Sequence, residues 1–510
     1  MLRIVLTAAL LLLPSLAHAD WYEASSAHFV VYSELAPAKL QAFSSKLERF
    51  DATMRWLRSK EDEPIGKANR VTVYMVDDQD DVAKLASDQG VAGFYVPRAG
   101  GSLAIVPRSA GDSENDLSAQ AILLHEYAHH LMWSFSPDAV YPAWYIEGWA
   151  ETLATAKFYD DGAVDIGRPP QYRAYGLMSG NALPIQKLLV ADTLKLDDQQ
   201  RDGLYGRGWL LSHYLLFSGQ RKGQLEAYLG AINDGKPAME AASAFGDLAK
   251  LDKELERYKT GKLLALKLPP DKIKAGGVTL RKLTPGEAAT MDVRIRSKVG
   301  VNEKTAPGVY ARAKKAAAGF PDDAAAQLVL AEAAFDAKDY AAAEAAADRA
   351  LNADPKAVDG HVYKAMARMA VAEKAGDESP ETWKGIRKII ATGNKIDPDD
   401  PEPLILYYRS FAESDTPPTE NAKLGLRRAF ELCPQDDSLR FNVATMYLRD
   451  GDKKAARALL APLAYQPHGR GIASVAATLI VLIDKGEIDA ALKTLDGEGK
   501  KDGQDANKKG

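Results

Sequence analysis

Two histidines four residues apart, with a glutamate directly after the first, place the strongest constraint on how the middle of this chain folds. The stretch Leu124–His130 reads Leu-His-Glu-Tyr-Ala-His-His, and the preceding Ser118–Leu124 contains no glycine or proline. An α-helix through both stretches is therefore expected. On a helix, the imidazoles of His125 and His129 lie on one face about one turn apart, where they can share a metal ion. Glu126 would then lie beside the open position of that ion and could take a proton from a water molecule.

A second helix is expected in the stretch Pro142–Glu151, after a turn-rich link. Zinc prefers four ligands and a catalytic site keeps one for water, so two histidines need a third protein ligand. Glu147, on a helix packed antiparallel to the first, is an economical source. Glu151 lies one turn further along the same face and could accept the free N–H of a ligating histidine, which fixes its tautomer. The alternative is a pair of helices with a purely structural role.

These residues resemble the gluzincin, or peptidase MA-like, zinc metallopeptidases, of which thermolysin and the aminopeptidase-N-like enzymes are members. The resemblance rests on H-E-x-x-H at 125–129 and E-G-x-A-E at 147–151, a core similar to that of secreted bacterial gluzincins. It implies one Zn²⁺ per chain and a zinc-activated water that hydrolyses a peptide bond. The implied roles are metal ligands His125, His129 and Glu147, general base Glu126, and Glu151 as hydrogen-bond partner of the first histidine.

The resemblance implies an α+β fold, with a thermolysin-like catalytic domain made of an N-terminal mixed sheet and a helical remainder. The sequence agrees with strands at 28–33 and 70–76, helices at 36–58 and 78–89, and a hairpin of strands 93–96 and 102–106. In gluzincins an edge strand of this sheet binds an extended peptide through backbone hydrogen bonds. By resemblance, Ser102–Val106 is that edge; the alternative is an ordinary core hairpin.

Two further stretches bear on the activity. Aminopeptidases of the family carry a G-x-M-E-N motif that holds the free amine of the substrate, whereas the matching Gly100–Ala104 has no glutamate. The chain is therefore predicted to be an endopeptidase rather than an aminopeptidase. In the family a tyrosine in a Y-x-K-G context donates to the oxyanion of the reaction. Residues 205–208, Tyr-Gly-Arg-Gly, are similar and suggest Tyr205, with His213 as the alternative donor.

The remaining histidines considered are not expected to bind the metal. His130 points away from the face of the two ligating histidines, and His28 lies far from the motif and is predicted to be a strand residue. The single cysteine, Cys433, allows no internal disulfide and is predicted to be a small buried residue.

After about residue 300 the chain becomes repetitive. Pro321, Pro355, Pro398, Pro434 and Pro467 follow one another at steps of 34, 43, 36 and 33 residues. A period near 34 that ends in proline resembles the tetratricopeptide repeat (TPR), so an all-α TPR solenoid is expected, with an insertion at 374–380 in the long step. Solenoids offer concave surfaces for peptides and proteins, and the repeats are therefore expected to bind a protein partner or the substrate. The preceding 278–283 and 291–296 alternate like two strands.

Export is expected from the first residues. Arg3, an apolar run at 4–13 and Ala-His-Ala at 17–19 are typical of a signal peptide, and the run is too short to span a membrane. The mature protein is therefore expected to be an exported bacterial protein, either periplasmic or secreted, with no transmembrane anchor. A net charge of −5 gives no reason to expect nucleic acid as a partner.

The sequence thus predicts an exported zinc metallopeptidase, acting on peptides or proteins, with a C-terminal TPR region. Two alternatives stay open: an exported TPR scaffold whose zinc domain does not catalyse, and a zinc amide hydrolase that acts on cell-wall peptides. The expected domains are a signal peptide (1–19), a gluzincin-like domain (20–260), a linker or small β element (261–305), a TPR-like solenoid (306–496) and a disordered tail (497–510).

Overall fold

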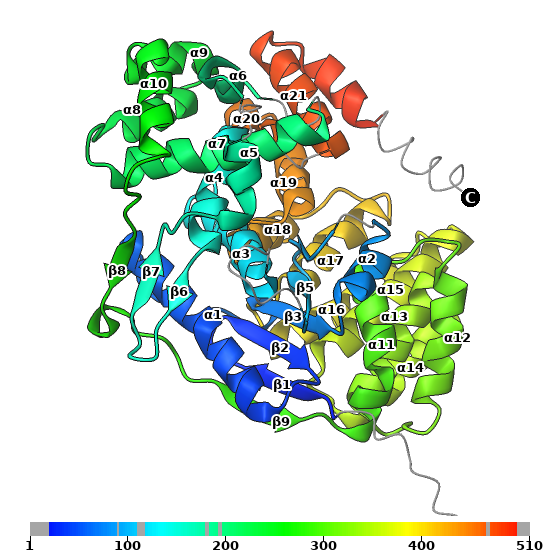
Figure 1. The fold of residues 1–510 in the computed structure, drawn as a ribbon. Coiled ribbons are helices and arrows are strands. Elements are labelled where there is room, and N and C mark those ends of the chain that lie inside the picture. Colours follow the sequence, from blue (N-terminus) through cyan, green and yellow to red (C-terminus); the bar gives the residue numbers. More distant parts are fainter. Residues whose placement is uncertain are drawn as a thin grey trace, which may run out of the picture.

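The computed structural model describes residues 20–496, with gaps at 89–90, 110–117, 179–182, 192–195 and 466–469. The predicted signal peptide, the predicted tail and Pro467 lie outside the described residues. A mixed α/β part comes first in the chain, and an arc of paired helices follows it (Figure 1). Both the mixed sheet and the helical solenoid predicted from the sequence are therefore present.

A mixed sheet forms the centre of the N-terminal part. Its six strands in the described residues lie in the order β4-β5-β3-β2-β1-β9. The strands β2, β3 and β5 are parallel to one another, whereas β1, β4 and β9 run antiparallel to their neighbours. Their bounds are β1 Tyr22–Ser25, β2 Phe29–Ser33, β3 Val71–Val76, β4 Phe94–Val96, β5 Leu103–Pro107 and β9 Thr279–Lys282. The predicted strands at 28–33 and 70–76 and the predicted hairpin are confirmed.

Helices cover both faces of this sheet. Val31, Val73 and Ala104 point to one face, where they pack with residues of α1 and α3. Tyr74 and Ile105 point to the other face, where they pack with residues of α2 and α11. The alternation follows from the two-residue period of a strand, and its consequence is a three-layer arrangement. The covering helices are α1 Pro37–Leu57, α2 Gln79–Ala86, α3 Ala119–Phe135 and α11 Pro285–Val299.

A helical group and a small second sheet complete the N-terminal part. The helices are α4 Ala143–Ala154, α5 Ala174–Met178, α6 Ile185–Leu189, α7 Asp198–Phe217, α8 Gln224–Asn233, α9 Ala238–Ala241 and α10 Leu248–Tyr258. Short 3₁₀ turns are η1 Lys67–Asn69, η2 Gln171–Arg173, η4 Ala242–Phe245 and η5 Pro270–Lys272. The second sheet has the order β6-β7-β8, with β6 Lys157–Phe158, β7 Val164–Ile166 and β8 Leu266–Leu268.

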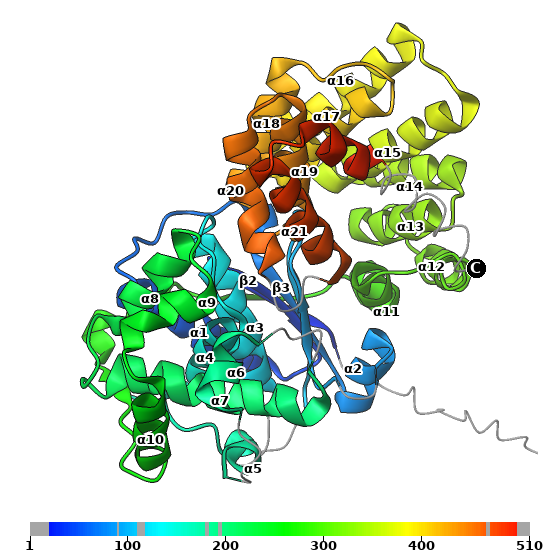
Figure 2. The same cartoon turned by 90° about the horizontal axis from the view of Figure 1, so that it is seen from above.

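The C-terminal part is a solenoid of antiparallel helix pairs. Its helices are α12 Ala306–Ala317, α13 Ala324–Asp336, α14 Tyr340–Ala353, α15 Val358–Ala375, α16 Pro380–Ile396, α17 Pro401–Ala412, α18 Glu420–Leu432, α19 Asp437–Arg449, α20 Lys453–Ala464 and α21 Arg470–Asp484. Pro321, Pro355, Pro398 and Pro434 lie after α12, α14, α16 and α18 and just before the next helix, so each closes a helix pair as the spacing predicts. From above, the helices form a curved wall beside the sheet (Figure 2).

One detail of the repeat region and one of the linker before it differ from the prediction. The long 43-residue step does not carry an inserted loop, because most of the extra residues lengthen α15 and α16 to 18 and 17 residues, against 13 and 14 in α13 and α14. The predicted strand at 291–296 is wrong, since these residues belong to α11. Met291 and Ile295 face the sheet while Val293 faces α12 and α13, so a helix buried on two sides produced the alternating pattern.

The predicted strand at 278–283 does exist, as β9. It pairs antiparallel with β1 and forms one border of the main sheet. The predicted linker region therefore contributes both a strand to this sheet and a helix to its cover. The chain thus runs from β9 of the main sheet through α11 directly into α12, the first helix of the solenoid.

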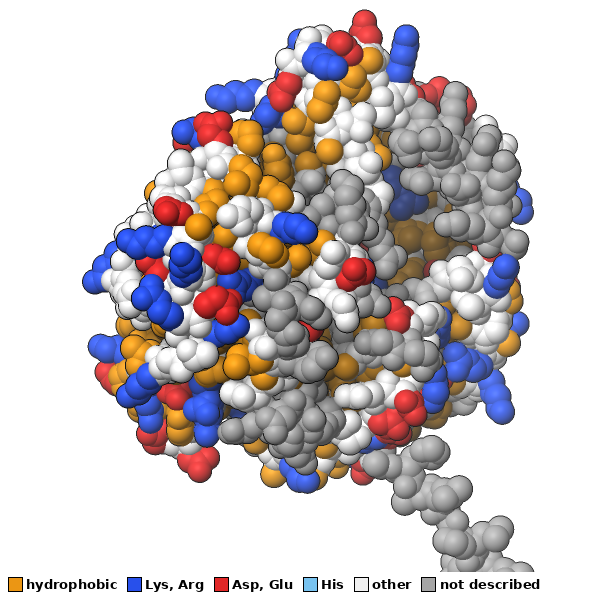
Figure 3. All heavy atoms as spheres, turned by 45° about the horizontal axis from the view of Figure 1, so that its top comes forward, with side chains coloured by type: hydrophobic (Ala, Val, Ile, Leu, Met, Phe, Trp, Pro, Cys, Tyr) orange, Lys and Arg blue, Asp and Glu red, His pale blue; other side chains and the backbone are white. Residues whose placement is uncertain are grey.

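On the face turned forward in Figure 3, basic and acidic side chains are interspersed rather than gathered by sign. No helix in the described part of the chain is long and apolar enough to cross a membrane. Cys433 is buried, as predicted, and burial raises the pKa of its thiol.

Candidate metal centre

Local sequence explains where the two central helices begin. The Ser118 hydroxyl accepts a hydrogen bond from the amide of Ala121 at 3.1 Å and so caps α3, the helix that carries the two histidines. Pro142 precedes α4 and provides an extended residue before its first turn. The two helices pack against each other, and the inner faces of both are buried.

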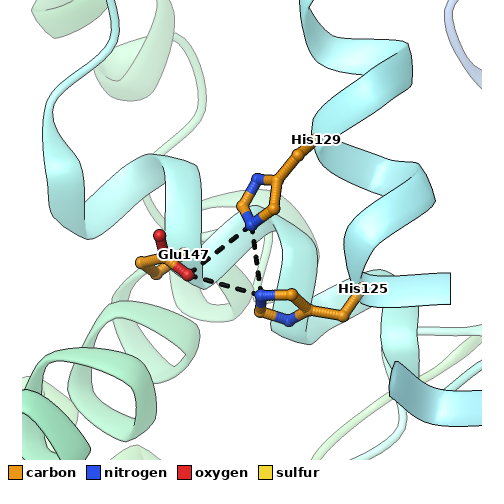
Figure 4. Close-up of side chains that lie close together, drawn as sticks. All are labelled: His125, His129 and Glu147. Carbon is orange, nitrogen blue, oxygen red and sulfur yellow. Dashed lines mark hydrogen bonds and ion pairs between the residues drawn. The ribbon is translucent and has the colours of Figure 1, made fainter. Parts of the chain in front are cut away.

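His125 and His129 on α3 and Glu147 on α4 point toward one another (Figure 4). The two histidine Nε2 atoms are 3.1 Å apart. Glu147 Oε2 lies 3.4 Å from His125 Nε2 and 3.6 Å from His129 Nε2. The structure therefore brings together the three residues that the sequence predicts as metal ligands.

The triangle of these three atoms has the size of one face of a tetrahedral zinc site. With bonds of about 2.0–2.1 Å, two ligand atoms of such a site lie about 3.3 Å apart. The observed separations run from 3.1 to 3.6 Å. Two imidazoles and one carboxylate also leave a fourth position for water, as catalytic zinc sites do. The donor set and its dimensions fit a zinc ion.

The charge around the triangle favours a cation. Glu147 is 0% exposed and Glu151 is 1% exposed. Burial lowers the pKa of His125, but a hydrogen bond to Glu147 and the charges of Glu151, Glu126 and Glu147 outweigh it and raise this pKa to about 9. Three carboxylates close to two imidazoles therefore create a site that holds positive charge, which a divalent ion can supply.

Glu151 lies beside the ring nitrogen of His125 that points away from the triangle, as predicted. Its Oε1 is 3.6 Å from His125 Nδ1, within reach of an ion pair but longer than a hydrogen bond. Tyr172 donates to Glu151 Oε2 at 2.9 Å, and Arg173 donates to Oε1 at 2.8 and 3.1 Å. Neither Tyr172 nor Arg173 is suggested by the sequence pattern, because both come from a short turn with no motif of its own.

Glu126 and Tyr205 both lie near the triangle. Glu126 is half-buried, and its charge acts on His125 and on Tyr205. The Tyr205 ring is 6.0 Å from the His125 ring, and the Arg173 guanidinium lies 4.7 Å from the centre of the Tyr205 ring. Burial and the charges of Glu147 and Glu126 raise the pKa of Tyr205, so its hydroxyl keeps its proton and can donate it to a hydrogen bond.

His213, the alternative oxyanion donor, does not lie in this site. It is fully buried, with Nε2 at 2.8 Å from the Gly167 carbonyl and Nδ1 at 2.8 Å from the Tyr258 hydroxyl. Both ring nitrogens are thus used in packing α7 against its neighbours. His213 therefore packs within the helix, as its position in the sequence favours, and the alternative role of oxyanion donor is not supported because the side chain faces the interior and not the metal triangle.

His130 and His28 both lie outside the triangle, and His28 lies in the bend directly before β2 rather than in the strand as predicted. His130 is buried, its Nδ1 lies 2.7 Å from the Tyr95 hydroxyl, and burial lowers its pKa to about 3. His28 precedes β2, and its ring nitrogens lie 3.0 Å from carboxylate oxygens of Glu48 and Asp62. Because carboxylates satisfy both nitrogens, His28 belongs to a separate ion-pair network.

The edge of the sheet nearest to α3 is β4, so the predicted edge at Ser102–Val106 is wrong. These residues form β5, which has β3 on one side and β4 on the other. Thr72 N donates to Ser102 O, just before β5, and Arg108 N donates to Val76 O, just after it. The even-numbered residues of this stretch therefore face β3 with their backbone N–H and C=O groups. The others, Leu103 and Ile105, pair with Val96 and Phe94. The backbone N–H and C=O of Tyr95 consequently point away from β5, at the open edge.

The stretch Gly100–Ala104 also lies elsewhere than expected. Gly100 and Gly101 form the turn after β4, where Gly100 packs against Glu402 of α17. They do not line the metal triangle, so their comparison with a motif that holds a substrate amine does not apply. The whole hairpin from 91 to 107 contains no aspartate or glutamate, however, so it offers no carboxylate for a free amine.

Comparisons with known proteins identify the repeats. Residues 304–369 match the tetratricopeptide repeat family. Two solved structures are similar: a thermophilic TPR protein from Thermus thermophilus (16% identity, 38% of this chain and 97% of that chain, TM-score 0.32), and yeast Tom70 (12% identity, 62% of this chain and 68% of that chain, TM-score 0.26). Both TM-scores are below 0.5, so neither structure bears on function. A comparison with curated proteins found no match.

Proposed function

We propose that this protein is an exported zinc metallopeptidase with a C-terminal TPR region. The observation that carries the proposal is the convergence of His125, His129 and Glu147 in a triangle of tetrahedral dimensions. Glu126 follows the first ligand on the same helix, where a general base is needed. The gluzincin resemblance and the geometry thus support the same site.

In the proposed reaction, a bound zinc ion would supply a water of lowered pKa and would polarise the carbonyl of the substrate. His125, His129 and Glu147 would hold the ion. Glu126 accepts a proton from the attacking water and later returns it to the leaving amine. The Tyr205 hydroxyl donates a hydrogen bond to the oxygen on which negative charge develops.

The residues around Glu151 keep the histidine side of the site in place. Arg173 balances the charge of Glu151 and also lies over the ring of Tyr205. One guanidinium therefore connects the carboxylate behind His125 with the proposed oxyanion donor. This arrangement orients two groups that have to act on the same substrate carbonyl.

The substrate is proposed to be an extended peptide that lies along β4. The N–H and C=O of Tyr95 face away from β5, and an added strand can bond to them. Cleavage of internal bonds is proposed for a peptide bound in this way. The absence of acidic residues from the hairpin also favours an endopeptidase over an aminopeptidase.

The TPR region is proposed to bind a protein, either a partner or the substrate itself. Tetratricopeptide repeats are modules for protein partners, and residues 304–369 match this family. The proposed location, periplasmic or secreted, rests on the signal-peptide pattern at 1–19.

Metal removal tests the proposal. The mature protein is incubated with a chelator, dialysed, and supplied with zinc or with magnesium, and each form is assayed on a broad peptide library. Cleavage that disappears with the chelator and returns with zinc alone is expected. Zinc binding without cleavage of peptides would favour the scaffold, and cleavage confined to cell-wall peptides would favour the amide hydrolase.

A further inference from the structure

The turn between β4 and β5 reaches across to the solenoid. The amide of Ala99 donates to Asp436 Oδ2 at 2.8 Å, and Gln435 donates to the Ser102 hydroxyl at 3.3 Å. Ala99 is 6% exposed and packs in the same apolar cluster as Leu426 and Leu439 of the solenoid. The tip of the hairpin is therefore part of the core of the repeats.

Two more residues of this turn contact α11 and a further helix of the solenoid. Arg98 donates to the carbonyl of Lys298, near the end of α11, at 2.7 Å. A Cβ on Gly100 would lie 2.2 Å from Glu402 Oε1 on α17, so this glycine allows the backbone to approach closely. The turn thus contacts α11, α17 and the start of α19, which are far apart in the sequence.

The charges of the two surfaces are complementary. Arg98 is the only charged residue of the hairpin from 91 to 107. Burial raises the pKa of both Glu402 and Asp436, and the positive charge of Arg98 is among the effects that oppose this rise. A cationic turn therefore lies among carboxylates of the repeats, which favours one docked position.

The other end of the hairpin is attached to the metal-binding helix. The Tyr95 hydroxyl lies 2.7 Å from Nδ1 of His130, the residue after His129. A Cβ on Gly93 would lie 2.5 Å from Cγ2 of Ile122 on α3, so strand and helix are in close contact. The hairpin consequently bridges α3 and the solenoid, and β4 itself carries the attachment to α3.

A neighbouring loop reinforces this docking. Asn69, at the end of η1, donates to the Asp399 carbonyl between α16 and α17 at 2.9 Å. Gly66 approaches the same residue, since a Cβ on it would lie 2.9 Å from Asp399 Cβ. The loops that lead into β3 and β5 are therefore both held by the repeats.

We propose that the solenoid positions the edge strand β4 for substrate binding by holding the β4–β5 turn, with Asp436 as the main positioning residue. This inference rests on the proposed peptidase function. Part of the TPR surface is then covered by the hairpin of the same chain. The repeats are a component of the peptidase rather than a separate adaptor. Asp436 acts through Ala99 and β4, and it touches neither the metal triangle nor the substrate.

Asp436→Asn tests the inference. Asp436 Oδ1 caps α19 by accepting from Leu439 N at 2.8 Å, and asparagine can keep that bond. Its amide group would replace Oδ2 with a donor, which faces the N–H of Ala99. The matched control is Asp452→Asn, because Asp452 caps α20 through Ala455 N at 2.9 Å and is exposed.

Hydrogen exchange of residues 93–106, zinc per chain, KM and kcat are measured on the full-length mature forms. For Asp436→Asn we expect exchange in 93–106 and KM to rise about five-fold or more, with kcat within about two-fold of wild type and zinc unchanged. The control should match wild type in all four.

Three outcomes would count against the inference. Unchanged exchange would show that Asp436 does not hold the turn, and faster exchange with unchanged KM would show that holding the turn does not position the substrate strand. A zinc-loaded wild type that cleaves no peptide would overturn the peptidase function itself, and the inference with it.

Discussion

Gly148 on α4 and Gly208 on α7 approach so closely that a Cβ on Gly148 would lie 2.2 Å from the carbonyl oxygen of Gly208. A Cβ on Gly208 would in turn lie 2.6 Å from the carbonyl oxygen of Trp144. The two helices therefore cross backbone to backbone. Glu147 is next to this crossing and Tyr205 lies one turn before it on α7, so the crossing sets the distance between a proposed ligand and the proposed oxyanion donor.

Gly148→Ala is expected to push these helices apart. The added methyl group meets the backbone carbonyl of Gly208 as well as the Ser212 hydroxyl, and a backbone group cannot rotate away, so the free energy of unfolding should fall by roughly 1–3 kcal/mol or more. Zinc affinity should fall as well, because Glu147 moves with α4. Thermal unfolding and zinc titration measure the two effects.

Gly230→Ala is the matched control, since Gly230 is exposed on α8 and a Cβ there has no atom within 4 Å. It should be neutral or stabilise by about 0.5–1 kcal/mol. Equal stability and equal zinc affinity in the two variants would contradict the importance of the helix crossing.

Tyr205→Phe should lower kcat by about 10²–10³-fold if the hydroxyl donates to the developing oxyanion. The ring is kept, so zinc content and thermal stability should stay close to wild type. Steady-state kinetics on one good substrate of the library give the value. Tyr214→Phe, on the same helix but bonded to Gln220 and Glu254, is the control and should keep full kcat. Similar kcat values for both variants would remove Tyr205 from the mechanism.

The raised pKa of the Asp400 carboxyl group predicts how the free energy of unfolding depends on pH. Burial, followed by the charge of Glu402, raises its pKa from 3.8 to about 8. The folded protein therefore binds more protons than the unfolded chain between these values, and the free energy of unfolding should fall as pH rises through this range. Asp400 Oδ1 accepts from Glu402 N, a bond that asparagine can keep.

Asp400→Asn should thus flatten the loss of stability between pH 5 and 8, on the order of 1–3 kcal/mol. Urea unfolding at several pH values measures it. Asp247→Asn, at an exposed cap of α10, is the control and should keep the wild-type slope. A wild-type slope in Asp400→Asn would show that this carboxyl group is not the source.

Local patterns predict the helices of the candidate site well. Two histidines at helical spacing, after a stretch without glycine or proline, predict α3, and the following Glu147 and Glu151 point correctly to the face of α4. The prolines that lie between successive helix pairs, before α13, α15, α17 and α19, likewise mark the boundaries of these pairs, because proline is disfavoured within a helix.

Relationships between distant residues could not be predicted in this way. The sequence of α11 alternates because the helix is buried on two sides, which imitates a strand. The edge strand was misplaced because β4 has only three residues and its neighbour β5 is longer and more apolar. Gly148 and Gly208, or Ala99 and Asp436, meet only through the fold, and no local pattern shows that they do.

In the proposed mechanism, Glu126 activates a water molecule beside a zinc ion that His125, His129 and Glu147 would hold. The most direct test compares wild type with Glu126→Gln, which has nearly the same shape but cannot take up a proton. Both are purified as mature protein, zinc per chain is measured, and cleavage of the peptide library is followed. We predict one zinc in each form and cleavage by wild type alone. Absence of zinc from both forms, or equal cleavage by both, would contradict the account.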